Sequence, residues 1–229
     1  MNKIALYIKQ RTEIRNEILK LRLESIKISR KIQEYNNEMR DMSSTGRTGD
    51  RKDQDYYITP IVEIEKFLIE FNRIIPLMGQ AVLDPSAGGD GDHPMSYPTA
   101  LEPYGCDIVT MDIREDSLAQ QKGDYLKKQF ITPEPTVIMT NPPFRLAIEF
   151  IKKALKDVRP GGHVAMLCRL NFFGSQKRKA FWNGNMPVYT FVHNKRMSFT
   201  ADGKTDSIEY AHLVWQRGVN PEYTRLKVI

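Results

Sequence analysis

From residue 61 to residue 215, short apolar segments alternate with segments of helical periodicity, and this alternation restricts the chain to few architectures. The predicted strands cover residues 81–83, 107–111, 136–140, 163–169, 188–192 and 208–215. The predicted helices cover residues 61–75, 115–129, 145–157 and 175–182. Strands that alternate with helices form parallel sheets with helices on both faces. We therefore expect an α/β fold of the doubly wound, Rossmann-like kind.

The first 42 residues follow a different pattern and contain no Gly or Pro. Apolar side chains recur there at alternating spacings of three and four, with Arg11 and Ser25 as the exceptions: Ile4, Tyr7, Ile14, Ile18, Leu21, Ile28, Ile32, Tyr35, Met39 and Met42. This spacing is typical of a coiled-coil seam. We expect residues 1–42 to form a long helix that pairs in a homodimer or with a partner, or else folds back on its own domain. Residues 43–55 are small and polar and predict a linker, and residues 56–229 predict the main domain.

Charge and composition narrow the functional classes. The net charge is +6, and the basic excess lies in residues 1–42 and 169–204, which indicates a polyanionic partner. Cys106 and Cys168 match no metal or redox spacing, the four histidines form no ligand pattern, and no metal is expected. No apolar run reaches the roughly 18 residues of a membrane span, and the N-terminus is charged where a signal peptide would be apolar. We expect a cytoplasmic protein with no membrane contact.

The first predicted strand runs directly into DPSAGGDG, residues 84–91. Ligands of doubly wound sheets bind beyond the carboxyl ends of the strands, and glycines there let the backbone approach them closely. Asp84, Gly88 and Gly89 fit such a site. The next strand ends at Asp112, where an acid is placed to accept both hydroxyls of a ribose.

The segment after this turn argues against a phosphate ligand. No Lys follows in the pattern of a phosphate-binding loop, and Pro94 and Pro98 interrupt the helix start that a pyrophosphate would need. The expected ligand is therefore a nucleoside without a phosphate chain.

The third predicted strand ends in the most specific motif of the chain, which runs from Thr140 through Asn141, Pro142 and Pro143 to Phe144. Two consecutive prolines fix the backbone, so the Asn141 amide and the Pro142 carbonyl can point into the cleft in fixed directions. An exocyclic amino group needs such a pair of acceptors, and the aromatic ring lies alongside.

With these motifs, residues 53–217 resemble the S-adenosylmethionine-dependent amino methyltransferases that act on adenine N6 of nucleic acids. The hallmarks of that family are a DPxxGxG turn followed by a [DN]PP[YFW] turn, in the order of its gamma group. The resemblance implies a class I methyltransferase sheet, mostly parallel with an antiparallel last strand, and S-adenosyl-L-methionine as cofactor. One departure is Asp90, which stands where the family has its second glycine and leaves the role of Gly91 open.

The resemblance also assigns roles to residues. The cofactor-binding positions it implies are Tyr57, Thr59, Pro60, Asp84, Pro85, Ser86, Ala87, Gly88, Gly89, Asp112, Ile113, Asp124 and Asn141. The catalytic positions are Asn141, Pro142, Pro143 and Phe144. Asn141 and Pro142 would accept the two hydrogens of the adenine amino group, and Phe144 would stack on the base, which must be flipped if the DNA is double-stranded.

Residues 169–185 mix the basic residues Lys177, Arg178 and Lys179 with four aromatic rings, which is a mixture that contacts phosphates and stacks on bases. The alternatives are a solvated helix face for the basic run and core packing for the rings. A later stretch resembles the last hairpin of phage-type adenine methyltransferases, where Arg196 and Phe199 would flank the flipped base. We expect double- or single-stranded DNA as the partner.

Related chemistries share this motif. An Asn-Pro-Pro-aromatic turn also serves enzymes that methylate exocyclic amines of RNA or glutamine side chains of proteins. A further alternative is a non-catalytic nucleic-acid-binding or scaffold protein, in which the altered DPSAGGDG turn holds no cofactor.

Overall fold

The computed structural model describes residues 10–11, 13–14, 17–18, 20–21, 24, 28, 58–128, 134–199 and 208–229. The chain divides into two compact units, residues 1–50 and residues 51–229. In the first unit every described residue is helical, as predicted, and its described apolar side chains are exposed: Ile14, Ile18, Leu21 and Ile28. The predicted linker, residues 43–55, lies outside the described residues. Pairing through the seam remains a prediction.

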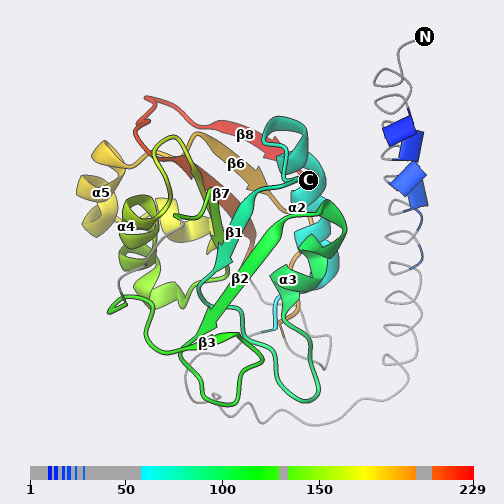
Figure 1. Cartoon of the computed structure of the whole chain (residues 1–229). Helices are drawn as coiled ribbons and strands as arrows, with labels where there is room; N and C mark the ends of the chain where they lie inside the picture. The colour runs from blue at the N-terminus through cyan, green and yellow to red at the C-terminus, as the bar shows by residue number, and fades with distance from the viewer. Residues whose placement is uncertain are drawn as a thin grey trace, which may run out of the picture. The chain divides into compact units, whose positions relative to one another are not determined.

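The second unit is built on an eight-stranded sheet with the order β3-β2-β1-β4-β5-β7-β6-β8 (Figure 1). The strands are β1 (Ala81–Asp84), β2 (Asp107–Asp112), β3 (Gln121–Lys122), β4 (Val137–Thr140), β5 (His163–Arg169), β6 (Tyr189–Val192), β7 (Tyr210–Gln216) and β8 (Arg225–Val228). The pairs from β3 to β5 are parallel, and β7 runs antiparallel to both β5 and β6. This mixed sheet confirms the predicted fold class.

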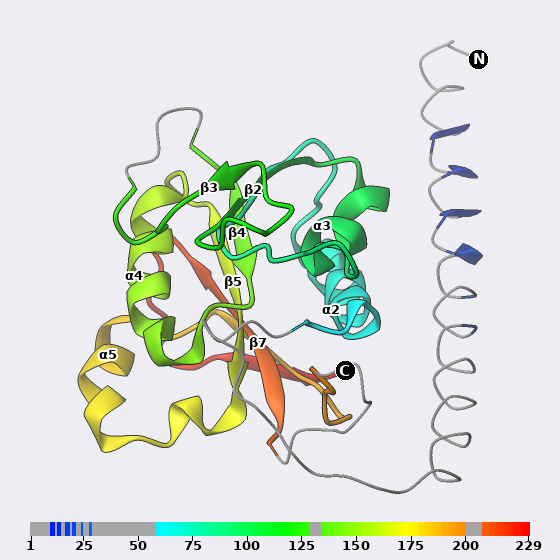
Figure 2. The same cartoon turned by 90° about the horizontal axis from the view of Figure 1, so that it is seen from below.

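Helices cover both faces of the sheet, as Figures 1 and 2 show. The helices are α2 (Ile61–Ile74), α3 (Ser96–Leu101), α4 (Ala147–Asp157) and α5 (Lys179–Gly184). The first two lie on one face of the sheet and the last two on the other. On α2 the buried residues Ile64, Phe67, Leu68 and Phe71 recur at the helical period, which forms the apolar stripe that faces the sheet. Each face therefore has its own apolar core.

The predicted helix 115–129 is wrong. Its described part, residues 115–128, forms turns and the two-residue strand β3. Gly123 has a φ of 129°, which a helix does not allow. The segment is instead tied to β2, because the Gln120 amide N–H donates to the Thr110 hydroxyl (2.9 Å) and the Thr110 amide N–H donates to the Gln120 side-chain oxygen (3.2 Å). These two hydrogen bonds hold the segment against β2, where the next two residues form the short parallel edge strand β3.

Besides β3, helix α3 and strand β8 were not predicted from the sequence. Helix α3 forms despite the nearby prolines, because Pro98 lies in its first turn, where a missing N–H breaks no intrahelical bond. Strand β8 is exposed along its whole length, so it carries no apolar signal. Among the described residues, none of the helices combines the length and the apolar character needed to span a membrane.

Candidate cofactor and substrate site

Asp84 lies at the carboxyl tip of β1 and is completely buried. Its Oδ1 accepts a hydrogen bond from the Ser86 amide (3.1 Å), whereas its Oδ2 is buried with no partner among the described residues. Burial raises the pKa of this carboxyl from 3.8 to about 7. A buried acceptor without a donor is unfavourable. Asp84 is therefore poised to receive a cationic or hydrogen-bonding group.

The DPSAGGDG turn folds back against β2. The Ala87 amide N–H donates to the Met111 carbonyl (2.9 Å), and Gly88 and Gly89 have φ values of 65° and 75°. A Cβ on Gly89 would approach the Met95 Cγ to 2.8 Å, so both conformation and space require glycine there. The turn therefore packs closely against the protein's own side chains at Gly89.

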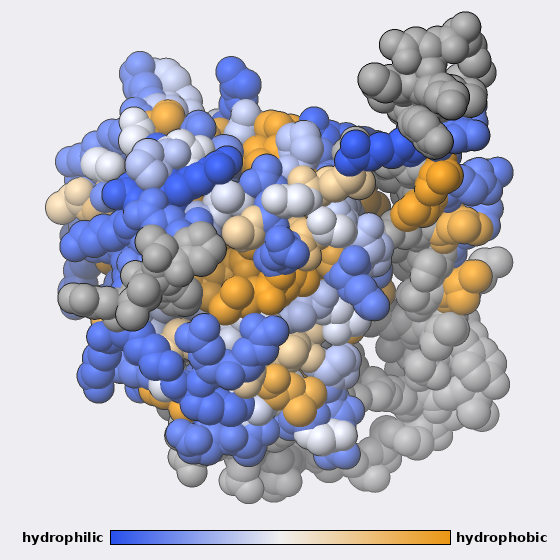
Figure 3. Space-filling view, in the orientation of Figure 1, coloured by the Kyte–Doolittle hydropathy of each residue, from blue (hydrophilic) through white to orange (hydrophobic). Residues whose placement is uncertain are grey.

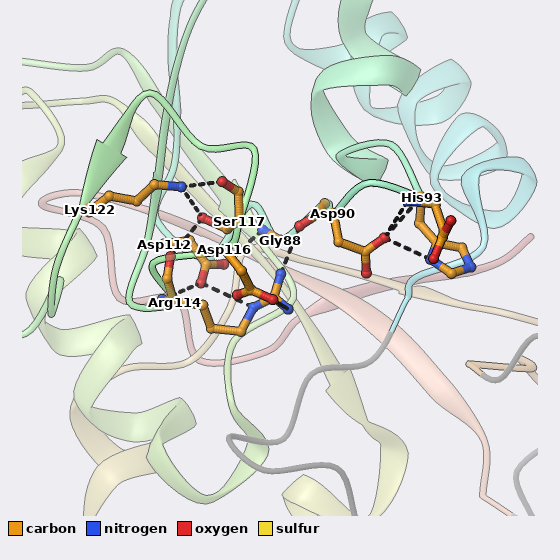
Figure 4. Close-up of polar contacts among 10 residues, drawn as sticks. Gly88, Asp90, His93, Asp112, Arg114, Asp116, Ser117 and Lys122 are labelled. Atoms are coloured by element: carbon orange, nitrogen blue, oxygen red, sulfur yellow. Dashed lines mark hydrogen bonds and ion pairs between the residues drawn. The ribbon is translucent and has the colours of Figure 1, made fainter.

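Asp112 holds this turn to the tip of β2 (Figure 4). Its Oδ2 accepts a bond from the Gly88 amide (2.8 Å), and its Oδ1 accepts one from the Arg114 amide (2.9 Å). The Arg114 guanidinium donates to the Gly89 carbonyl (2.7 Å) and lies 3.6 Å from Asp112 Oδ1. A carboxylate has about four acceptor positions, so Asp112 keeps capacity for two ribose hydroxyls. Sequence reasoning missed Arg114, whose only signal is its place two residues after the acid.

Asp90 forms a loop of its own at the point where the sequence departs from the family pattern (Figure 4). Its Oδ1 accepts bonds from the amides of Asp92 (2.9 Å) and His93 (2.8 Å) and contacts His93 Nδ1 (3.0 Å). Gly91 is exposed, and a Cβ there would have no atom within 4 Å. The conformation of this loop therefore depends on Asp90, and Gly91 has no steric role.

Two further predicted cofactor residues, Ile113 and Asp124, lie near Asp112. Ile113 is 56% exposed and follows it directly. Asp124 follows β3, where its Oδ1 accepts a bond from the Leu126 amide (3.0 Å) and its Oδ2 pairs with Lys127 (3.2 Å). In the orientation of Figure 1, the surface of the molecule has an apolar area near its middle, as Figure 3 shows. Tyr57 lies outside the described residues.

The Asn-Pro-Pro-Phe turn is held by a residue far away in the sequence. The Asn141 amide nitrogen donates to the hydroxyl of Thr59, 82 residues earlier, at 2.9 Å, and Thr59 is buried just before α2. This bond fixes the side-chain amide. Its oxygen, Oδ1, is buried and has no partner among the described residues. The turn therefore presents a fixed and unused hydrogen-bond acceptor after β4, the strand that pairs with β1.

No protein family profile and no curated protein matches the chain. Solved structures do match. A candidate RNA methyltransferase from Pyrococcus horikoshii is 14% identical over 78% of this chain and 95% of its own, with a TM-score of 0.55. A candidate class I S-adenosylmethionine-dependent methyltransferase from Listeria monocytogenes is 13% identical over 79% and 68%, with a TM-score of 0.52. The chain has the class I methyltransferase fold.

Another similar structure is the methyltransferase subunit of a type I restriction-modification system from Streptococcus thermophilus. It is 13% identical, its TM-score is 0.54, and the match covers 75% of this chain. The match spans only 47% of the subunit, so this chain corresponds to about half of it. At these identities the likeness establishes the fold, and the substrate has to be argued from the site.

Within the class I methyltransferase fold, Phe144 stands at the edge of a small apolar cluster. Its ring lies 5.6 Å from that of Tyr210, and the Arg169 guanidinium lies over it at 4.8 Å. Phe199 is 8% exposed and packs edge-on against Tyr210 at 4.8 Å. Arg196 is exposed and pairs with Glu209 at 3.1 Å. The structure thus brings Phe199 to the cluster behind Phe144 and leaves Arg196 in an ion pair at the surface.

The basic segment around α5 divides into two kinds of residue. Lys177 and Lys179 are exposed, but Arg178 donates to the Phe172 carbonyl (3.0 Å) and lies over the Phe172 ring at 4.6 Å. The four aromatic rings of the segment pack against one another, with centroid distances from 4.8 to 6.3 Å, and they join the core on the α4 face: Phe172, Phe173, Phe181 and Trp182. In this structure the rings are part of the core.

A buried polar network, which sequence reasoning missed, lies under the start of α2. Glu63 Oε2 contacts His193 Nδ1 (3.2 Å), His193 Nε2 contacts His212 Nδ1 (2.8 Å), and His212 Nε2 contacts the Tyr97 hydroxyl (2.8 Å). Every hydrogen bond in this chain is satisfied when both histidines are neutral. The Tyr97 hydroxyl then donates to His212, His212 donates to His193, and His193 donates to Glu63. Burial lowers the pKa of both histidines, that of His212 well below its usual value. Glu63 also pairs with Lys66 at 2.8 Å.

The network matters for the site because of where its ends lie. Glu63 is in the first turn of α2, four residues after Thr59, so the network fixes the helix start that holds Asn141. At the other end, burial raises the pKa of Tyr97 well above its usual value, and the charge of Asp84 adds to this effect. The network therefore links α2, α3 and β7 around the candidate site.

Proposed function

We propose that the chain transfers a methyl group from S-adenosylmethionine to an exocyclic amino group of a nucleic-acid base, with adenine N6 in DNA as the target. The observation that carries this proposal is Asn141 Oδ1, a buried acceptor that has no partner among the described residues and whose amide is fixed by Thr59. A catalytic group held before the substrate arrives needs no reorganisation during the reaction.

The cofactor proposal is supported by the turn between β1 and β2. Asp84 offers a buried oxygen without a hydrogen-bond partner among the described residues, Gly88 and Gly89 give the turn its positive φ values, and Asp112 retains acceptor capacity for a ribose. Asp112 and the exposed Ile113 would hold the adenosine, and Asp84 would face the positively charged amino-acid end. When bound, S-adenosylmethionine supplies an electrophilic methyl group.

The chemical task of the protein is to make a poor nucleophile reactive. The lone pair on an adenine amino group is delocalised into the ring. If Asn141 Oδ1 and the Pro142 carbonyl accept its two hydrogens, electron density shifts onto the nitrogen and the lone pair faces the incoming methyl group. The amino proton leaves after transfer, so this scheme needs no general base before it. Phe144 would stack on the base, which repays part of the few kcal/mol needed to flip it.

Adenine in DNA is favoured over other amino substrates by the phenylalanine at the last motif position and by the exposed Lys177 and Lys179. Two of the similar structures also have nucleic-acid roles in their names: the restriction-modification subunit and the candidate RNA methyltransferase. An exocyclic amine of RNA is therefore the second candidate. Protein glutamine and a non-catalytic scaffold are the remaining alternatives.

The experiment that tests this function is incubation with labelled S-adenosylmethionine and separate DNA, RNA and protein substrates, followed by mass spectrometry of the digested nucleosides. We expect N6-methyl-2′-deoxyadenosine from DNA. Asn141→Ala should abolish most of it, whereas Asn194→Ala, which changes an exposed asparagine after β6, should not. Label in RNA or protein alone would replace the DNA proposal, and absence of cofactor binding in calorimetry would favour the scaffold.

We also propose that the N-terminal helix pairs with a second copy of the chain. The described apolar residues of the seam are between 44% and 61% exposed: Ile14, Ile18, Leu21 and Ile28. Their spacings of four, three and seven residues follow the heptad, which supports pairing between helices.

A further inference from the structure

Arg169 is the last residue of β5, and the register places it close to the Asn-Pro-Pro-Phe turn. Thr140, at the tip of β4, pairs with Met166 of β5, so β5 extends three residues beyond that level. Arg169 is held there by pairing with Tyr210 of β7. Its guanidinium carbon lies 4.8 Å from the centroid of the Phe144 ring. Arg169 therefore stands beside the ring that is proposed to stack on the target base.

The Arg169 side chain has no anionic partner within the described part of the chain. Its Nε is buried without a hydrogen-bond partner, and its guanidinium lies over the Phe144 ring. Other arginines near the site are engaged: Arg114 bonds to the Gly89 carbonyl, Arg178 to the Phe172 carbonyl, and Arg196 to Glu209. Arg169 thus differs from these three arginines, because its side chain bonds to no carbonyl or carboxylate within the described residues.

The buried Nε–H without an acceptor is unfavourable, because a ring face attracts the cation but accepts no N–H in the guanidinium plane. Its planar set of donors matches two oxygens of a phosphate or a carboxylate. We propose that Arg169 binds a backbone phosphate next to the target base. This inference rests on the proposed function and deepens it, because it makes the substrate a nucleic acid and excludes glutamine side chains of proteins.

The first test measures binding without catalysis. The full-length protein is titrated against a fluorescein-labelled single-stranded oligodeoxynucleotide containing one adenine, at several salt concentrations. Arg169→Gln should weaken binding about tenfold and reduce the slope of log affinity against log salt by about 0.7, the value for one lost phosphate contact on a single strand. Arg169→Lys keeps the charge and should keep the slope. Arg73→Gln removes an exposed charge from the last turn of α2 and should behave as the parent.

A second test changes the ligand and leaves the protein intact. A neutral methylphosphonate replaces each phosphate around the adenine in turn. We expect one position at which the parent loses affinity about tenfold and Arg169→Gln loses none, because the contact is already absent. If the glutamine variant does not fold, the methylphosphonate series can still be measured with the parent and Arg169→Lys. The proposal would be overturned if no phosphate beside the adenine affects the affinity of the parent when it is replaced.

Other outcomes separate this proposal from its alternatives. An unchanged salt slope in Arg169→Gln together with weaker S-adenosylmethionine binding in calorimetry would assign Arg169 to the carboxylate of the cofactor and overturn the phosphate contact. If the parent methylates adenine but the slope does not change, the phosphate contact is wrong and the proposed function stands. If the slope changes but no substrate is methylated, the phosphate contact stands and the proposed reaction fails.

Discussion

The stability of the cofactor-free protein should depend on pH through Asp84. Burial raises the pKa of its carboxyl from 3.8 to about 7 in the folded protein. Between these values the folded protein keeps the proton and the unfolded chain has lost it. The stabilising contribution is therefore fully present below pH 3.8 and is lost as the pH rises toward 7. Asp84→Asn keeps the shape of the side chain and cannot ionise, so it removes this dependence.

The magnitude follows from the pKa. Each pH unit between the two values lowers the free energy of unfolding by about 1.4 kcal/mol. From pH 5 to about 7 the free energy of unfolding of the parent should therefore fall by about 3 kcal/mol, whereas that of Asp84→Asn should not show this fall. The assay is urea unfolding of both proteins, without cofactor, at pH 5 and pH 8. The other titrating groups, His193 and His212 included, are common to both proteins, so the difference between the two curves isolates Asp84.

A matched control is Asp107→Asn, which removes an exposed carboxylate from the start of β2. Its unfolding free energy should follow that of the parent at both pH values. If the advantage of Asp84→Asn is the same at pH 5 and pH 8, Asp84 is not held protonated by burial. The interpretation of its free Oδ2 as an acceptor prepared for a cationic ligand would then fail.

Four further predictions test the site and the helix. Asn141→Ala should lower kcat by about a hundredfold or more, about 3 kcal/mol, because it removes one oriented acceptor; a parent-like rate would remove the residue from catalysis, and calorimetry should show little change in cofactor affinity. Asp112→Ala should weaken S-adenosylmethionine binding by about 1–3 kcal/mol in calorimetry, the range for charge-assisted bonds, and unchanged affinity would exclude it from the site. Because burial lowers the pKa of His212, stability should fall as the pH drops below about 6.5, and His212→Phe should flatten that decline in acid unfolding curves. The parent should sediment as a dimer at micromolar concentration, and replacing Ile18 and Ile32 by Asp should produce monomers, since each charge would be buried in the seam; a monomeric parent contradicts the pairing.

The strands of the central sheet could be predicted because burial on both faces makes them continuous apolar runs. β5, with residues 164–168 all buried, is the clearest example. The tips of β1, β2 and β4 then fix where Asp84, Asp112 and Asn141 stand. By contrast, β3 has two residues and β8 is exposed along its length, so neither carries a hydrophobic pattern.

The contacts that hold the site could not be predicted from local patterns. The Asn141 partner is 82 residues away, and Glu63 meets His193 across 130 residues. Periodicity and turn signals report neighbours within a few positions, so they do not identify such pairs. The contacts of the arginines could not be predicted for the same reason. The run around Arg178 is conspicuous in the sequence, yet its guanidinium bonds to a backbone carbonyl, whereas the isolated Arg169 faces Phe144.

The strand order has a consequence for how the protein is made. β6 has β7 and β8 as its neighbours, and both follow it in the chain. While a ribosome has delivered the polypeptide only to residue 209, β5 and β6 both present open edges, which invite pairing with other chains. β7 must then insert between them, over seven residues of β5, and it brings His212 into place. The site therefore cannot be completed until β7 has been synthesised, and ribosome-bound chains that end before β7 should be prone to aggregation.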